Sequence, residues 1–211
     1  MKCILKFFIL SIVTLSLTNI SPILAQTGTE DYISRIEAQR QQKDSLFADS
    51  TAHGPLSEAD RAGFDGLRYF AIDPQYRVTA RLVRNTKPTE RKMATSDHRS
   101  RSYRVFGELH FSLGGQNCHL TIYEPLQPIP GYPKHLFLPF TDQTSGQESY
   151  GGGRYLDLTI PKSDTLELDF NRAYNPYCAY SPAYSCPIPP RQNRLPIAVR
   201  AGEKIYEEED H

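Results

Sequence analysis

The sequence predicts a mainly β fold, an antiparallel sandwich or small barrel of about seven strands with an N-terminal helix. From residue 67 onward, apolar and polar residues alternate with the period of two that is typical of strands. The composition supports this, because 16 prolines, 13 tyrosines and 10 phenylalanines favour strands and fixed loops over long helices.

Residues 1–25 are predicted to be a secretory signal peptide. Two lysines precede an apolar run of 11 residues (7–17), and Ala25 supplies the small residue that a cleavage junction needs. A membrane span needs roughly 20 continuous apolar residues, and Asn19 and Pro22 interrupt this stretch. We therefore expect an exported protein, periplasmic or extracellular, soluble or loosely surface-associated, with no stable membrane insertion after cleavage. An uncleaved membrane anchor is the alternative.

Cleavage would leave residues 26–211, enough for one domain with a real core. The whole chain has 24 basic and 24 acidic residues, and the signal removes two lysines, which leaves 22 against 24. No basic field exists that could hold nucleic acid. The sequence therefore predicts no nucleic-acid partner, and it contains no motif that calls for a cofactor.

Four segments divide the chain. After the signal, residues 26–55 should form a helical segment and linker, with the helix over 29–47. Its apolar positions are Tyr32, Ile33, Ile36, Leu46 and Phe47. Residues 56–206 form the β-rich domain, and 207–211 a charged tail. The predicted strands are 76–83, 102–113, 117–123, 134–140, 154–160, 166–170 and 197–201. Residues 86–100 are predicted to be a loop, as are the proline-rich segments 125–133 and 174–196.

A hairpin around Gly114-Gly115 fixes a specific register, because two glycines suit a two-residue turn. One face then pairs apolar residues: Phe111 with Cys118, Leu109 with Leu120 and Gly107 with Ile122. The other face pairs His110 with His119, Glu108 with Thr121 and Ser112 with Asn117. A one-residue slip would mix the two sets, so the hydrophobic pattern resists it.

Two groups of residues could bind a metal. Glu108, His110 and His119 form a set of two histidines and one carboxylate that zinc or ferrous iron accepts. Alternating polar residues are also what a solvated sheet face shows, so we expect no metal here. Cys178 and Cys186 are separated by seven residues and are expected to form a disulfide outside the cytoplasm. Two buried thiols or metal ligation are the alternatives, and Cys118 is expected to be a buried free thiol.

The segment 140–155 is the most unusual in composition. Asp142 lies among several hydroxyl residues, and three glycines (151–153) precede Arg154. Exposed backbone amides beside a guanidinium can receive an anion. The alternative is a structural turn, in which Asp142 and the threonines satisfy backbone groups.

The chain resembles domain-of-unknown-function family 1684 over about residues 56–206. The resemblance is carried by YFAIDPQYRVTARL (69–82), FTDQTSGQESYGGGRYLD (140–157), LDFNRAYNPYCAYSPAYSCPIPP (168–190) and NRLPIAVRAGEK (193–204). It implies no reaction. It does imply that the important positions are Phe140, Asp142, Thr144, Gly146, Tyr150, Gly151, Gly153, Arg154, Asp169, Asn171, Tyr174, Asn175, Pro176, Cys178, Cys186 and Asn193.

Three functions are compatible with these residues. The first is a binding module for a small polar or anionic ligand such as a sugar or carboxylate. Its expected ligand-binding residues are Asp142, Tyr150, Arg154, Asp169, Asn171, Tyr174 and Asn175. The second is a hydrolase of envelope or dietary polymers, with Asp142, Glu148 or Asp169 as acid or base. The third is a structural or interaction protein, in which the same motifs only fix loops.

Overall fold

The computed structural model describes residues 21–51, 54–87 and 89–206. Most of the predicted signal peptide and the charged tail therefore lie outside the described residues. Helix α1 (Ser21–Ala48) begins before the predicted cleavage junction at Ala25. None of the helices in the described ranges is long and apolar enough to cross a membrane.

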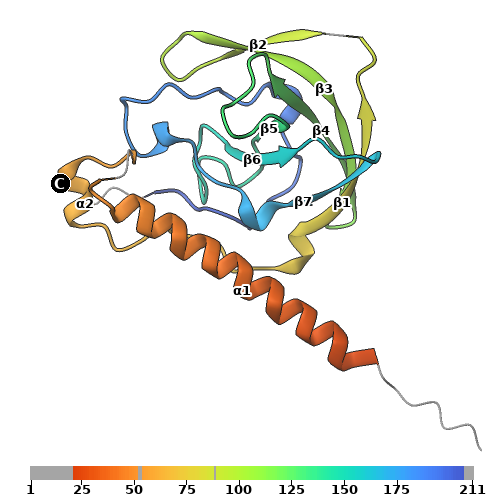
Figure 1. Ribbon diagram of the computed structural model, residues 1–211, viewed down its shortest axis with the longest axis horizontal. Helices are drawn as coiled ribbons and strands as arrows, with labels where there is room; N and C mark the ends of the chain where they lie inside the picture. Colours follow the sequence, from red (N-terminus) through yellow and green to blue (C-terminus); the bar gives the residue numbers. More distant parts are fainter. Residues whose placement is uncertain (1–20, 52–53, 88, 207–211) are drawn as a thin grey trace, which may run out of the picture.

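A single antiparallel sheet forms the body of the protein and curls into a half-barrel (Figure 1). The strand order is β6-β5-β4-β3-β1-β7, and β2 pairs with β3. The strands are β1 (Arg77–Arg84), β2 (Glu90–Ala94), β3 (Ser100–Leu113), β4 (Gln116–Pro125), β5 (His135–Phe140), β6 (Arg154–Thr159) and β7 (Thr165–Asp169). The short helical turns are α2 (Glu58–Ala62) and η1 (Pro74–Tyr76) before the sheet, and η2 (Phe170–Arg172), η3 (Tyr177–Ala179) and η4 (Arg191–Asn193) after it. The predicted mainly β class is confirmed.

The β3–β4 hairpin has the predicted register throughout. Phe111 lies opposite Cys118, Leu109 opposite Leu120 and His110 opposite His119. Gly114 and Gly115 have φ values of 58° and 77°, which a tight two-residue turn needs and which glycine adopts without strain. Cys118 is a buried free thiol, as predicted.

Two secondary-structure predictions were wrong. Residues 86–100 are not only a loop, since β2 lies within them and pairs with β3 from Glu90 to Ala94. Met93 is the one buried residue of β2, so the strand has almost no apolar alternation for the sequence to show. Conversely, residues 197–201 form no strand. The backbone of Val199 and Ala201 bonds instead to the side chains of Asp142 and Arg154.

The main core lies inside the curled sheet. Its fully buried members come from five strands, the turn after β7 and the segment 199–201: Ala80, Leu109, Leu120, Ile122, Leu136, Leu138, Phe140, Leu168, Phe170, Val199 and Ala201. Those on strands alternate with residues on the outer face, which explains why the period-two pattern predicted these strands correctly.

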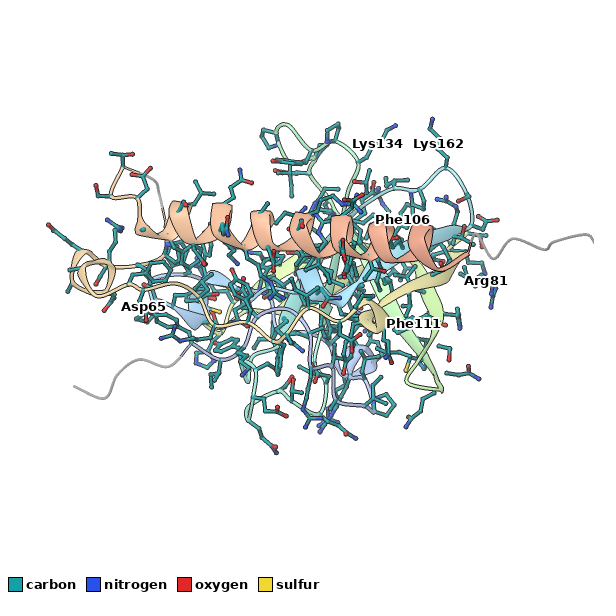
Figure 2. All side chains as sticks on the ribbon, turned by 90° about the horizontal axis from the view of Figure 1, so that it is seen from below. Asp65, Arg81, Phe106, Phe111, Lys134 and Lys162 are labelled. Carbon is teal, nitrogen blue, oxygen red and sulfur yellow. The ribbon has the colours of Figure 1, made fainter. Side chains whose placement is uncertain are left out.

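Helix α1 packs along one side of this body, as two perpendicular views show (Figures 1 and 2). From Gly28 onward, the buried residues of α1 are Tyr32, Ile36 and Phe47, and Arg40 and Lys43 are half-buried. Because these residues recur at intervals of three or four, they lie on one face of the helix. The docking face of α1 is therefore partly cationic, whereas Leu46, expected on the apolar face, is exposed.

Gly107 is required where β3 approaches β1. A Cβ atom at this position would lie 2.5 Å from the carbonyl oxygen of Val83 and 2.9 Å from Leu82 Cδ1. We expect Gly107→Ala to lower the free energy of unfolding by about 2 kcal/mol, because overpacking forces backbone shifts. Urea unfolding measures this. Gly63→Ala is the control, since nothing lies within 4 Å of its Cβ position, and equal stability of both variants would contradict the prediction.

Candidate functional site

Arg154, at the start of β6, lies in the core rather than in a ligand site. The residue is 0% exposed. Its Nη2 donates to Asp142 Oδ2 at 2.8 Å and to the carbonyl of Val199 at 2.8 Å, and its Nη1 donates to the carbonyls of Ala201 and Glu203. Burial lowers the pKa of the guanidinium, and the Asp142 charge opposes that shift. The expected anion receptor is thus occupied by the protein's own carboxylate and carbonyls.

Asp142 organises the loop after β5 in the same way. Its Oδ1 accepts from the backbone N–H of Thr144 at 2.7 Å, from the Thr144 hydroxyl at 2.6 Å and from the backbone N–H of Val199 at 3.1 Å. Ser149 adds a hydroxyl contact to Thr144 at 2.8 Å. This is the structural-turn alternative that the sequence left open, and it leaves neither carboxylate oxygen free for a ligand.

Asp169 and Asn171 hold helix α1 against the sheet. Asp169 Oδ1 accepts from the Tyr32 hydroxyl at 2.9 Å and from the Asn171 backbone N–H at 3.1 Å. The Asn171 amide donates to the Tyr32 oxygen at 2.9 Å and accepts from the backbone N–H of Asp73. Burial and the Asp169 carboxylate raise the pKa of Tyr32 above its usual range. Asp169 and Asn171 therefore mainly position helix α1, which lies far from them along the chain.

Glu203 is a buried carboxylate that sequence reasoning missed. It is 2% exposed, and its Oε1 pairs with Lys43 of α1. Its Oε2 accepts from the Asn175 backbone N–H at 2.7 Å and from the Tyr180 hydroxyl at 2.6 Å. Asn175, predicted to bind a ligand, donates its side-chain amide to the carbonyl of Lys204. The only sequence signal for Glu203 was its place in the run NRLPIAVRAGEK (193–204), which carries part of the family resemblance.

The expected disulfide between Cys178 and Cys186 is not formed, and both residues are free thiols. The Cys178 backbone N–H donates to Cys186 Sγ at 3.3 Å. Tyr150, another predicted ligand residue, places its hydroxyl 3.8 Å from Cys178 Sγ. The structure therefore places the two residues side by side as free thiols, and the expected disulfide between them is not shown.

A cleft of about 390 Å³ lies between α1 and the segment after β7. It brings together only two of the predicted ligand residues, Asn171 and Tyr174. The other lining residues are Ile36, Gln39, Arg40, Gln42, Lys43, Tyr69, Arg172, Ala173 and Glu203. Its volume falls within the range of small-molecule sites.

A smaller cavity of about 180 Å³ adjoins this cleft through Arg172 and Tyr174. It lies between β6 and β7, the two ends of the sheet, and Asp157, Glu167 and Asp169 contribute carboxylates to its lining. Tyr174 lines both spaces, and its hydroxyl donates to Asp157 Oδ2 at 2.7 Å. Burial and the Asp157 charge raise the pKa of Tyr174 well above its ordinary value.

The cleft between α1 and the segment after β7 has a net positive lining. Arg40, Lys43 and Arg172 oppose a single carboxylate, that of Glu203. Arg40 donates through Nη1 to the carbonyl of Phe70 at 3.0 Å and lies 4.5 Å from the centre of the Tyr69 ring. Its Nε and Nη2 are shielded from solvent and have no hydrogen-bond partner among the described residues. Burial lowers the pKa of this guanidinium, because the charge is only partly compensated.

The carboxylates considered for a hydrolase are not assembled into a catalytic pair at the cleft. Asp142 is buried in the Arg154 network, and Glu148 pairs with Arg200 at 2.8 Å on the surface. Asp169 lines the smaller cavity but accepts hydrogen bonds from Tyr32 and Asn171. The two-histidine set also remains at the surface, where Glu108 pairs with His110 at 2.7 Å. No group of three or more metal-ligating side chains occurs within residues 21–51, 54–87 and 89–206.

We expect Arg154→Met to lower the free energy of unfolding by about 3–5 kcal/mol, because it leaves Asp142 as an uncompensated buried charge. Thermal and urea unfolding measure the loss. Arg200→Met is the matched control, since it removes an arginine–carboxylate pair from the surface, and it should leave the unfolding midpoint nearly unchanged. A similar small effect of both variants would show that the buried network is not a stability determinant.

Comparisons with known proteins agree with this architecture but add no activity. A search of curated proteins finds no match. Among solved structures, the solution NMR structure of an uncharacterised protein from Haloarcula marismortui is 40% identical. The match covers 84% of this chain and 96% of that chain with a TM-score of 0.65. The family profile described as "Protein of unknown function (DUF1684)" matches residues 62–204, more than half of the sequence. The chain therefore belongs to this family of proteins of unknown function.

Proposed function

We propose that the protein is a binding module for a small carboxylate-bearing molecule, such as a sugar acid, and that the ligand occupies the cleft between α1 and residues 171–174. The observation that carries the proposal is the Arg40 guanidinium. Two of its nitrogens are buried at the cleft and lack an acceptor among the described residues. Leaving such donors unpaired costs free energy, which an acceptor would recover once the half-buried Arg40 side chain turns these nitrogens toward the cleft.

The charge balance of the cleft favours an anion. Glu203 is fully engaged by Lys43, Asn175 and Tyr180. Its charge therefore offsets Lys43 and leaves Arg40 and Arg172 as the net positive groups of the lining. Arginine guanidinium groups bind carboxylates through two parallel hydrogen bonds, which gives both affinity and orientation.

The remaining lining suits a compact polar molecule. Tyr69 and Tyr174 add aromatic rings to the lining, with Arg40 over the first ring and Lys43 over the second. The exposed amides of Gln39 and Gln42 offer donors and acceptors for hydroxyl groups. Ile36 adds an apolar side chain to the lining, which a ligand could contact. This mixture of aromatic faces and a few polar groups is typical of small-molecule sites.

Export is a separate part of this proposal, supported by the pattern of residues 1–25 alone. If the protein works outside the cytoplasm, its ligand is a molecule present there. The cleft itself depends on residues 36–43 and 69–203, downstream of the predicted cleavage junction.

A thermal-shift screen followed by calorimetry tests the binding proposal. The panel contains glucuronate, galacturonate, succinate and citrate, with glucose as the neutral control. An acidic compound should raise the unfolding midpoint by mass action. Arg40→Gln should then weaken its binding by roughly tenfold to a hundredfold, as expected for the loss of a charge-assisted hydrogen bond.

Arg35→Gln is the matched control, because Arg35 is an exposed arginine of the same helix. It should bind the acidic compound like the unchanged protein. The stability of each variant without ligand is measured separately, so that a folding defect is not mistaken for lost binding. Equal affinity of Arg40→Gln and Arg35→Gln, or no acidic compound that binds, would refute the site.

A further inference from the structure

The loop between Tyr174 and Pro190 holds two thiols side by side in a fixed geometry. Cys186 exchanges backbone contacts with the β2–β3 turn: its N–H donates to Ser96 Oγ at 3.1 Å, and its carbonyl accepts from the Ser96 N–H at 2.9 Å. Cys178 lies in the short turn η3, and its backbone N–H reaches Cys186 Sγ at 3.3 Å. Both cysteines are therefore placed by ordered backbone and not by a flexible loop.

The surroundings of the two thiols differ. Cys178 is half-buried and accessible from solvent, whereas Cys186 is buried. The Tyr150 hydroxyl lies 3.8 Å from Cys178 Sγ. A hydrogen bond from the Cys186 thiol lowers the pKa of Cys178 to about 6, and Tyr150 and Ser96 act in the same direction. Donating that hydrogen bond raises the pKa of Cys186.

From this geometry we propose that Cys178 is a nucleophilic thiol that reacts with hydroperoxides and that Cys186 is its resolving partner. An accessible thiol, a hydroxyl donor and a second buried thiol in contact are the arrangement that such a two-cysteine site needs. The site is separate from the cleft of Arg40, and none of its cysteines lines that cleft. The two proposals therefore stand or fall independently.

The reaction balances with the peroxide as oxidant. The Cys178 thiolate attacks one peroxide oxygen, the O–O bond breaks, and the leaving oxygen takes a proton to form water or an alcohol. Cys178 is then a sulfenic acid. The Cys186 sulfur attacks that sulfur, an S–S bond forms, and water leaves with the Cys186 proton. The two electrons lost by the thiols reduce the peroxide, and a dithiol reductant returns the pair to its starting state.

Cys118 provides an internal comparison. It is buried on the inner face of β4, and burial raises the pKa of its thiol. It has no neighbouring thiol among the described residues. We expect it to react slowly with peroxides and with alkylating reagents, because the thiolate is the reactive form.

The test treats the reduced full-length protein with hydrogen peroxide and maps the products by mass spectrometry. The mass of the unchanged protein should fall by two hydrogen atoms, and the peptide map should show a disulfide between Cys178 and Cys186. Dithiothreitol should restore the original mass. Cys186→Ser should stop at the sulfenic acid, which dimedone traps on Cys178. Cys178→Ser should form neither product, and Cys118→Ser should behave like the unchanged protein.

The pH dependence of alkylation by iodoacetamide separates a tuned nucleophile from a merely accessible thiol. The rate at Cys178 should reach half its plateau near pH 6, and at that pH it should exceed that of an ordinary thiol by about tenfold. Tyr150→Phe should move the midpoint upward without preventing folding. A midpoint above pH 8 for Cys178, or peroxide oxidation that never links Cys178 to Cys186, would overturn the proposal.

Discussion

The buried ion pair between Arg154 and Asp142 is the interaction on which the rest of the structure depends. Burying a guanidinium costs several kcal/mol unless its charge and donors are matched. Here Asp142 matches the charge, and the carbonyls of Val199, Ala201 and Glu203 accept hydrogen bonds from the two terminal nitrogens, while Nε has no partner among the described residues. The ion pair therefore ties the segment 199–203 to the sheet. The end of the segment also bonds to backbone, because the Gly202 carbonyl accepts from the Phe70 N–H at 2.9 Å and the Glu203 N–H donates to the Ala173 carbonyl at 2.9 Å.

The segment 199–203 also links the Arg154 network to the N-terminal helix α1. Once its backbone is fixed, the Glu203 side chain meets Asn175, Tyr180 and Lys43 of α1. A second link joins Tyr32 of α1 to Asp169 at the end of β7. The helix thus docks through polar groups at two separated points, and the space left between them and the sheet is the cleft that Arg40 lines. The core network and the candidate site form one connected system.

The sequence predicted well wherever one local pattern dominated. The hairpin register followed from Gly114-Gly115 and the alternation on either side of it, because a slip would expose Leu109 and Leu120. Prediction failed where the pattern was weak or misleading. In β2, only Met93 is buried, so the strand looked like a polar loop. Nothing in the sequence pointed to Arg40 and Lys43 as residues of the docking face, because charged residues on a helix are usually exposed. Of the predicted ligand residues, Asn171 and Tyr174 reach the cleft, whereas Asp142 and Arg154 lie in the core.

By itself, the sequence determined the mainly β class, most strands, the hairpin faces, the burial of Cys118 and the family. All of these depend on contacts between near neighbours or on motifs that are contiguous along the chain. Only the tertiary structure decided what the unusual residues do. Whether Arg154 receives a ligand or an internal carboxylate depends on carbonyl partners 45 to 49 residues away as well as on Asp142, which is 12 residues away. Whether Lys43 faces water or Glu203 depends on a partner 160 residues away. Spacing along the chain carries no record of such partners, because distant segments meet only when the sheet curls and α1 packs against it.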